Sequence, residues 1–255
     1  MKGIFQTYGK YYDFIYAEKD YEKERRFIED IFRRFSDSPP SKILDIACGT
    51  GGHTIVFANE GYAVTGVDSS DAMIEIAREK AKKTCSGNVD FHVMDMRKLK
   101  LNQQFDACIC MFSGMNYLLT YEDIKKTLRG IRKHLATNSL FVFDFWNGVA
   151  VLTVSPSTRT KVIERGDERL IKIAVPRLDA MRHLCEVTYH CLVIQKNRVV
   201  DEFEEKHVVR FFFPREIQNY LEENGFTLLG MCPFLSLEEK ADEKTWNLTA
   251  ISQVE

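Results

Sequence analysis

The chain has 255 residues, of which 45% are hydrophobic, and this size predicts one main domain with an elaboration rather than two equal halves. A formal net charge of -2 provides no positive field for a polyanion, so nucleic acid is not an expected partner. No apolar run reaches the roughly 20 residues of a membrane span, and the seven scattered cysteines indicate reduced thiols, so we expect a cytoplasmic protein without a membrane segment.

Four tyrosines lie within the first 20 residues: Tyr8, Tyr11, Tyr12 and Tyr16. Their phenol groups could close over a ligand from outside a sheet, or their rings could cap the core. Apolar residues recur at helical spacing over 21–35, and residues 36–40 then break this helix. Residues 1–36 are therefore expected to form an N-terminal helical lid.

The segment 42–53 predicts a buried strand, a glycine turn and the start of a helix. Gly49 and Gly51 leave out side chains at a point where a ligand must approach the backbone, and N–H groups of the following helix would face the turn. The third glycine of a dinucleotide-binding pattern is absent, since Thr54 stands there, while Asp45 lies inside the strand. We therefore expect a cradle for a nucleotide or nucleoside, with a carboxylate suited to a cationic amine.

Two further acids follow predicted strands. Residues 63–67 read as a strand that ends in Asp68, and residues 88–95 alternate in polarity and end in Asp95-Met96. The carboxyl ends of parallel strands surround the ligand in sheets of this kind. The first acid could thus accept ribose hydroxyls, and the second could accept an adenine amino group.

Strands continue to alternate with helices as far as residue 146. An apolar strand at 105–112 runs into a loop at 113–117. A helix whose apolar seam ends at Leu135 follows Thr120, and residues 140–146 form the fifth strand. This order predicts an α/β fold with a doubly wound, Rossmann-like and mostly parallel seven-stranded sheet.

The pattern changes after the fifth strand. Strand-like runs joined by short polar turns predict an inserted antiparallel β-meander, which could roof the pocket or form the interface of a homodimer. A helix from Pro214 and two last strands would then complete the core sheet. The expected units are the helical lid at 1–36, the α/β core at 37–146, the β insertion at 147–213, and the last helix and strands at 214–255.

The run Leu44-Asp45-Ile46-Ala47-Cys48-Gly49-Thr50-Gly51 resembles the first motif of the class I S-adenosylmethionine (SAM) dependent methyltransferases. The resemblance implies SAM as the cofactor. In that family the glycine turn lies against the methionine part of SAM, Asp45 helps to hold its amino group, Asp68 takes the ribose hydroxyls, and Asp95 meets the adenine. The cofactor-binding residues that the resemblance implies are Tyr12, Asp45, Ala47, Gly49, Gly51, Asp68, Ser69, Asp95, Met96 and Met111.

Within that family, the segments 12–16 and 111–117 are similar to the enzymes that N-methylate amino groups of nucleotide-linked sugars. Carried over by position, Tyr16, Tyr117 and His207 would line the acceptor pocket as catalytic residues. His207 or Tyr117 would take or relay the proton of the amine, and Tyr16 would help to close the site. Read without the resemblance, His207 could be an ordinary hydrogen-bonded residue of a β-ribbon, and Tyr117 could cap its loop.

The expected function is methyl transfer from SAM to a small-molecule acceptor, an amine. The alternatives are O-methylation of a small hydroxyl compound, a non-catalytic SAM-binding protein, and a nicotinamide-dependent oxidoreductase, which the incomplete glycine pattern disfavours. The histidines and cysteines lack the paired spacing of a zinc site, so no metal is predicted.

Overall fold

The computed structural model describes residues 7–255, so the first six residues of the expected lid lie outside it. The core strands are β1 (Lys42–Ile46), β2 (Ala63–Asp68), β3 (Val89–Val93), β4 (Phe105–Cys110), β5 (Leu135–Trp146), β10 (Phe226–Pro233) and β11 (Asn247–Val254). The inserted strands are β6 (Arg159–Arg165), β7 (Glu168–Asp179), β8 (Leu184–Gln195) and β9 (Arg198–Arg210). The helices are α1 (Thr7–Ile15), α2 (Tyr21–Phe35), α3 (Gly52–Asn59), α4 (Asp71–Thr84), α5 (Tyr121–His134), α6 (Gly148–Thr153) and α7 (Pro214–Glu222), with short 3-10 helices η1 (Met96–Lys98), η2 (Gly114–Tyr117) and η3 (Ala180–Arg182).

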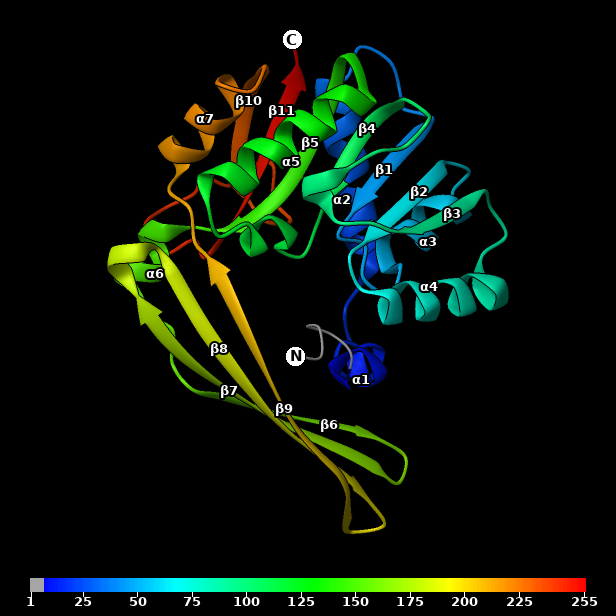
Figure 1. Cartoon of the computed structure of the whole chain (residues 1–255), viewed down its shortest axis with the longest axis vertical. Helices are drawn as coiled ribbons and strands as arrows, with labels where there is room; N and C mark the ends of the chain where they lie inside the picture. Colours follow the sequence, from blue (N-terminus) through cyan, green and yellow to red (C-terminus); the bar gives the residue numbers. More distant parts are fainter. Residues whose placement is uncertain (1–6) are drawn as a thin grey trace.

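Two sheets organise these elements (Figure 1). The core sheet has seven strands in the order β10-β11-β5-β4-β1-β2-β3, and β11 runs antiparallel to both of its neighbours. The second sheet has four antiparallel strands in the order β6-β7-β8-β9. The expected fold, a mostly parallel seven-stranded sheet with an antiparallel meander inserted after the fifth strand, is confirmed.

Two local features differ from the sequence-based expectation. Leu135 was expected in the apolar seam of a helix, but α5 ends at His134 and Leu135 begins β5, where it pairs with Phe105. Pairing with a buried neighbouring strand thus outweighs the helical periodicity at this residue. Helix α6 was not predicted, and its first turn is capped by the side chain of Asn147, which accepts from the backbone N–H of Val149.

Helices cover both faces of the core sheet. On one face α2 and α3 pack Phe27 and Phe57 in the same buried cluster as Ile109 of β4. On the other face α5 packs Leu128 in a cluster with Phe143 of β5. Because successive side chains of a strand point to opposite faces, each buried strand feeds both clusters, which explains the continuous apolar runs in the sequence.

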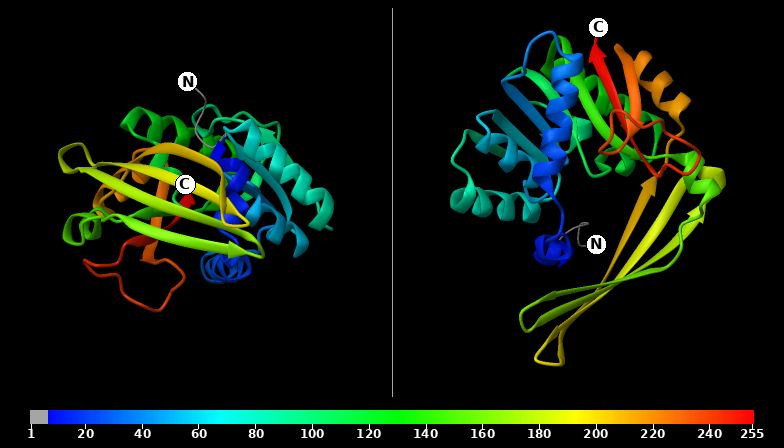
Figure 2. Two further views of the ribbon diagram at one scale, coloured as in Figure 1. Left: turned by 90° about the horizontal axis from the view of Figure 1, so that it is seen from below. Right: turned by 180° about the vertical axis from the view of Figure 1, so that it is seen from behind.

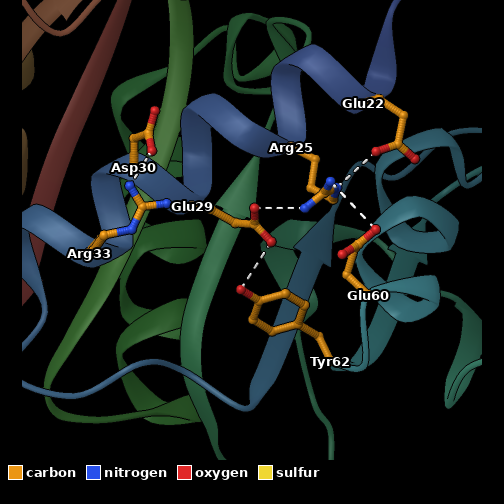
Figure 3. A network of polar contacts seen from close by, with 7 residues as sticks. All are labelled: Glu22, Arg25, Glu29, Asp30, Arg33, Glu60 and Tyr62. Carbon is orange, nitrogen blue, oxygen red and sulfur yellow. Dashed lines mark hydrogen bonds and ion pairs between the residues drawn. The ribbon is translucent and has the colours of Figure 1, made fainter.

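A buried guanidinium ties α2 to the neighbouring α3 region (Figure 3). Arg25 is only 7% exposed and donates to Glu29 at 2.6 Å and to Glu22 at 3.0 Å, while Glu60 beyond α3 lies 3.5 Å away. Glu29 also accepts from the hydroxyl of Tyr62. A buried charge is tolerated only when it is paired in this way, so the network fixes α2 against the sheet.

Helix α1 lies between the core sheet and the meander, as both Figure 1 and the rear view in Figure 2 show. Its apolar side chains Tyr8, Phe14 and Ile15 form a buried cluster with Leu170 of β7 and Val193 of β8. The tyrosine-rich segment is therefore packed onto the insertion, which is far from it in sequence.

The chain enters and leaves the meander at one place. The backbone N–H of Phe212 donates to Trp146 at 3.0 Å, and the N–H of Gly148 donates to Phe212 at 2.8 Å. Asn147 and Phe212 thereby form a parallel bridge. This bridge anchors the root of the meander to the carboxyl end of β5.

Asp45 in β1 is buried away from solvent, with 1% of its surface exposed. Its Oδ2 accepts a hydrogen bond from the Thr54 hydroxyl at 2.6 Å. Burial is the largest influence on this carboxyl and raises its pKa to about 6, although the nearby His53 and the bond from Thr54 oppose the shift.

Asp45→Asn tests this burial through the pH dependence of stability. The pKa of an aspartate in the unfolded chain is about 3.9, so the folded protein holds the Asp45 proton more tightly. The unfolding free energy of the wild type, relative to the variant, should fall by about 3 kcal/mol as pH rises from about 4 through about 6, and should then level off. Urea unfolding of both proteins from pH 4 to pH 8 measures this difference. A relative gain of wild-type stability over the same interval would contradict it.

Gly51 provides a second test of the fold. It has a φ of +75° at the N-cap of α3, and a Cβ there would stand 2.9 Å from the Phe91 ring. Gly51→Ala should cost about 2–4 kcal/mol of unfolding free energy because left-handed strain and a steric clash add together. Gly166→Ala is the matched control, since that glycine has a φ of +58° with no atom within 4 Å of the added carbon, and should cost about 1 kcal/mol. Equal losses in chemical denaturation would show that the Phe91 contact carries no weight.

Candidate active site

The carboxyl ends of β1, β2, β3 and β4 border a cavity of about 600 Å³. Each strand delivers lining residues: Gly49 from the turn after β1, Asp68 from the end of β2, Asp95 from beyond β3, and Met111 from beyond β4. Small-molecule sites have volumes of roughly 300–1,000 Å³, so this cavity, called here the cofactor cavity, is large enough for a nucleoside derivative.

Asp68 is fixed by two backbone donors. Its Oδ2 accepts from the N–H of Gly49 at 2.9 Å, and its Oδ1 accepts from the N–H of Ser70 at 2.9 Å. Burial, its largest influence, raises the pKa of Asp68 despite these bonds. Because a carboxylate can accept about four hydrogen bonds, capacity for ligand hydroxyls remains.

The glycine turn leaves room for a ligand. Gly49 has a φ of +56°, and a Cβ added to it would meet no atom within 4 Å. Its conformation and the open space beside it fit a turn that a ligand approaches at backbone distance. The residues present therefore fit an adenosyl cofactor, with a carboxylate at one strand end and an uncovered glycine at the next.

Asp95 is held differently, by a side-chain fork. The Nε of Arg97 lies 2.9 Å from Oδ1 and its Nη2 lies 2.6 Å from Oδ2. This bidentate bond is the main reason that the pKa of Asp95 is lowered. Asp95 and Arg97 therefore line the cofactor cavity as an ion pair.

A second cavity, called here the acceptor cavity, has a volume of about 170 Å³. Three aromatic side chains, those of Tyr12, Phe112 and Tyr117, line both cavities. The remaining wall comes from the α1 segment, from η2 and the residue before it, from the strands β8 and β9 of the meander, and from the ends of β5 and β11. The core and the insertion thus enclose the acceptor cavity together.

A chain of polar contacts starts at this shared wall. The Tyr117 hydroxyl lies 2.8 Å from Nδ1 of His207, and Nε2 of His207 lies 3.1 Å from a carboxylate oxygen of Glu205. A carboxylate only accepts, so we assign the ring proton to Nε2 from its nearness to Glu205, and Nδ1 is then the acceptor of the Tyr117 hydroxyl. Burial raises the pKa of Tyr117 well above its usual value, so this phenol is a neutral hydroxyl.

Tyr16 lies on the α1 side of the acceptor cavity. Its hydroxyl is 3.0 Å from that of Tyr8 and 3.4 Å from the Nζ of Lys172 on β7. Burial lowers the pKa of Lys172 to about 8 and raises that of Tyr16. The meander therefore fixes the orientation of Tyr16 through a lysine.

Most of the sequence-predicted site residues meet at the two cavities. Those that line the cofactor cavity are Tyr12, Ala47, Gly49, Asp68, Ser69, Asp95, Met96, Met111 and Tyr117. Tyr16 and His207 line the acceptor cavity. Asp45 and Gly51 line neither, because Asp45 is buried against Thr54 and Gly51 packs beside Phe91. Their contact with a cofactor stays a prediction.

The sequence-based search missed several lining residues. Lys19, Tyr21 and His53 line the cofactor cavity, where Lys19 and His53 both contact the buried carboxylate of Glu24. No motif marks these residues, because their convergence depends on how α2 and α3 pack. Asn116, which lines the acceptor cavity, could have been found from the sequence, since it stands next to Tyr117 in the predicted loop.

Across residues 7–255, no three His, Cys, Asp or Glu side chains are grouped so that they could hold a metal ion. None of the helices in that part of the chain is long and apolar enough to cross a membrane.

Comparison with known proteins gives a consistent set of similarities. Residues 43–138 match a family model described as a methyltransferase domain. The chain is 27% identical over 226 residues to a putative methyltransferase, YqeM, of Bacillus subtilis (strain 168), covering 88% of this chain and 87% of that protein.

Two further relatives are named for the sugars on which they act. The dTDP-3-amino-3,4,6-trideoxy-alpha-D-glucopyranose N,N-dimethyltransferase of Streptomyces venezuelae is 27% identical, over 86% of this chain and 88% of that protein. The dTDP-3-amino-3,6-dideoxy-alpha-D-glucopyranose N,N-dimethyltransferase of Streptomyces fradiae is 27% identical, over 86% of this chain and 82% of that protein.

The fold has a close counterpart among solved structures. An S-adenosylmethionine-dependent methyltransferase from Clostridium acetobutylicum ATCC 824 superposes with a TM-score of 0.79 at 22% identity, covering 96% of each chain. The domain match, the relatives and the shared seven-stranded topology agree with the strand-end cavity described above. Residues 43–138 thus match a methyltransferase domain, and the chain is similar to SAM-dependent methyltransferases over most of its length.

Proposed function

We propose that this methyltransferase N-methylates a small molecule, the amino group of a nucleotide-linked amino sugar, with the reacting ring in the acceptor cavity. The observation that carries the proposal is the shared wall: Tyr117 lines both cavities, and its hydroxyl is hydrogen-bonded to His207. A base is therefore available where a methyl donor on one side would meet an amine on the other. The two Streptomyces relatives named for amino-sugar N,N-dimethylation support this acceptor class.

In the cofactor cavity, each part of SAM would contact a different residue. Gly49 would lie against the methionine part, Asp68 would accept from the ribose hydroxyls, and Asp95 would meet the adenine amino group. When bound, SAM supplies a methyl group activated by its sulfonium sulfur. The protein then has to align the nucleophile and exclude water, which the aromatic wall of Tyr12, Phe112 and Tyr117 favours.

Tyr117 and His207 would handle the proton of the amine. The nitrogen lone pair would form the new N–C bond as the S–C bond of SAM breaks, which would leave a thioether and a positively charged methylammonium. Tyr117 accepts one ammonium proton as it passes its own hydroxyl proton to Nδ1 of His207. The Glu205 carboxylate at Nε2 stabilises the resulting imidazolium, in the manner of a base oriented by a third group.

His207→Gln tests this role. The variant keeps a polar side chain but removes the base, so kcat should fall by about 10²- to 10⁴-fold. Binding of S-adenosylhomocysteine should be unchanged, because His207 does not line the cofactor cavity. The measurements are transfer of labelled methyl from SAM to dTDP-3-amino-3,6-dideoxyglucose, and calorimetry with S-adenosylhomocysteine.

His190→Gln is the matched control. His190 lies on the neighbouring strand β8 with 47% of its side chain exposed, and its replacement should leave turnover intact. Wild-type activity of His207→Gln would remove the proton relay from the mechanism. Equal methylation of the amino sugar and of its counterpart with a hydroxyl in place of the amine would contradict amine selectivity and favour O-methylation.

A further inference from the structure

Asn116 has a buried side-chain amide. Its side chain has no exposed surface, and neither Nδ2 nor Oδ1 has a partner among residues 7–255. The residue belongs to η2, where its backbone N–H donates to Ser113 at 3.1 Å, and its side chain lines the acceptor cavity. The backbone of Asn116 is thus fixed, and the residue stands in the wall of the acceptor cavity with its amide fully buried.

An orphaned amide of this kind is costly. Buried polar side chains are nearly always hydrogen-bonded, because an unmade bond forfeits the hydration that the group had in water. The mechanism above gives Asn116 no part. A residue that destabilises the free protein and faces a ligand cavity is better explained by a hydrogen bond made to the ligand.

A second amide reaches the same cavity from another element. Asn247, the first residue of β11, also lines the acceptor cavity, and its buried Oδ1 lacks a partner in the described part of the chain. Asn116 and Asn247 come from separate parts of the chain, stand in the wall of one cavity of about 170 Å³, and both have unfilled hydrogen-bonding capacity within the described residues. A small number of polar groups that converge in a mostly aromatic wall is typical of a ligand-binding site.

The chemistry of an amide selects the kind of group that it binds. A carboxamide offers both a donor and an acceptor, and so does a hydroxyl, whereas an ammonium only donates and a carboxylate only accepts. Since Asn116 precedes Tyr117, which faces the reacting amine in the proposed function, the group that it meets lies beside that amine. The small cavity volume restricts the contact to the reacting ring.

We infer that Asn116, together with Asn247, is a specificity-determining site that binds a ring hydroxyl next to the amino group of the acceptor. This inference rests on the proposed function and goes beyond it, because it separates amino sugars that differ by one hydroxyl. Acceptors that lack the hydroxyl leave the amide unpaired at the moment of transfer.

The experiment compares three probes with the wild type and Asn116→Leu. The reference probe, dTDP-3-amino-3,6-dideoxyglucose, carries hydroxyls at C2 and C4 on either side of the amine, and the other two probes lack one of these hydroxyls each. Removing the recognised hydroxyl should lower wild-type kcat/KM at least about tenfold. In Asn116→Leu, removing this hydroxyl should lower kcat/KM by less than about threefold. Compared with the wild type, the variant should lose most of its kcat/KM toward the reference probe.

Two readouts separate recognition from folding. The melting temperature of Asn116→Leu should equal or exceed that of the wild type, since a buried unpaired amide has been removed, and affinity for S-adenosylhomocysteine should be unchanged. Thr127→Val is the matched control, because its buried hydroxyl also lacks a partner in the described chain but lines neither cavity. The Thr127→Val variant should show the same order of kcat/KM values for the three probes as the wild type. Asn247→Leu tests the same hydroxyl from the opposite wall, and it replaces Asn116→Leu if that variant does not fold.

Unchanged probe ratios in the leucine variant, with all three sugars methylated, would overturn this inference alone. If the wild type binds S-adenosylhomocysteine yet methylates none of the three sugars, the proposed acceptor class falls, and the inference falls with it.

Discussion

Parallel pairing of β1 with β2 and β4 is the constraint on which the site depends. Parallel strands deliver their carboxyl ends to one edge, so residues separated by long helical crossovers arrive at one cavity. Gly49 and Asp68 illustrate the result: they lie at the ends of two paired strands and are joined by a hydrogen bond of 2.9 Å. The same register places Tyr117, beyond β4, at the border of the acceptor cavity.

The two cavities depend on different parts of the chain. The cofactor cavity is built mainly from strand ends of the core, whereas the acceptor cavity needs α1, the meander and the ends of β5 and β11. The bridge between Asn147 and Phe212 anchors the meander beside the sheet, so its inner face reaches the core without altering the strand order. Changes in β8 would therefore alter the acceptor cavity and leave the strand ends that border the cofactor cavity in place.

Short sequence patterns predicted those site residues whose position depends only on the neighbouring strand. A strand followed by an acid places that acid at a sheet edge, which is why Asp68 and Asp95 were found from the sequence and line the cavity. Asp45 lies within a strand, and only the packing of α3 shows that Thr54 covers it. The six-residue helix α6 is too short to carry a periodic signal.

Long-range convergence could not be predicted from one sequence. The orientation of His207 depends on Glu205, two residues away on β9, and on Tyr117, which is 90 residues away. Asn116 and Asn247 look like ordinary loop and strand residues until tertiary packing leaves both amide atoms of Asn116 and the Oδ1 of Asn247 without partners among residues 7–255. The resemblance placed Tyr16, Tyr117 and His207 on the acceptor side, whereas the two amides of the acceptor cavity became visible only in the structure.

A crystal structure of the protein with S-adenosylhomocysteine tests the central claim most directly, because it shows where the sulfur that carried the methyl group lies. We predict that the ribose hydroxyls contact Asp68 and that the sulfur faces the wall formed by Tyr12, Phe112 and Tyr117. A sulfur that points away from this wall, with no route to the acceptor cavity, would contradict the account.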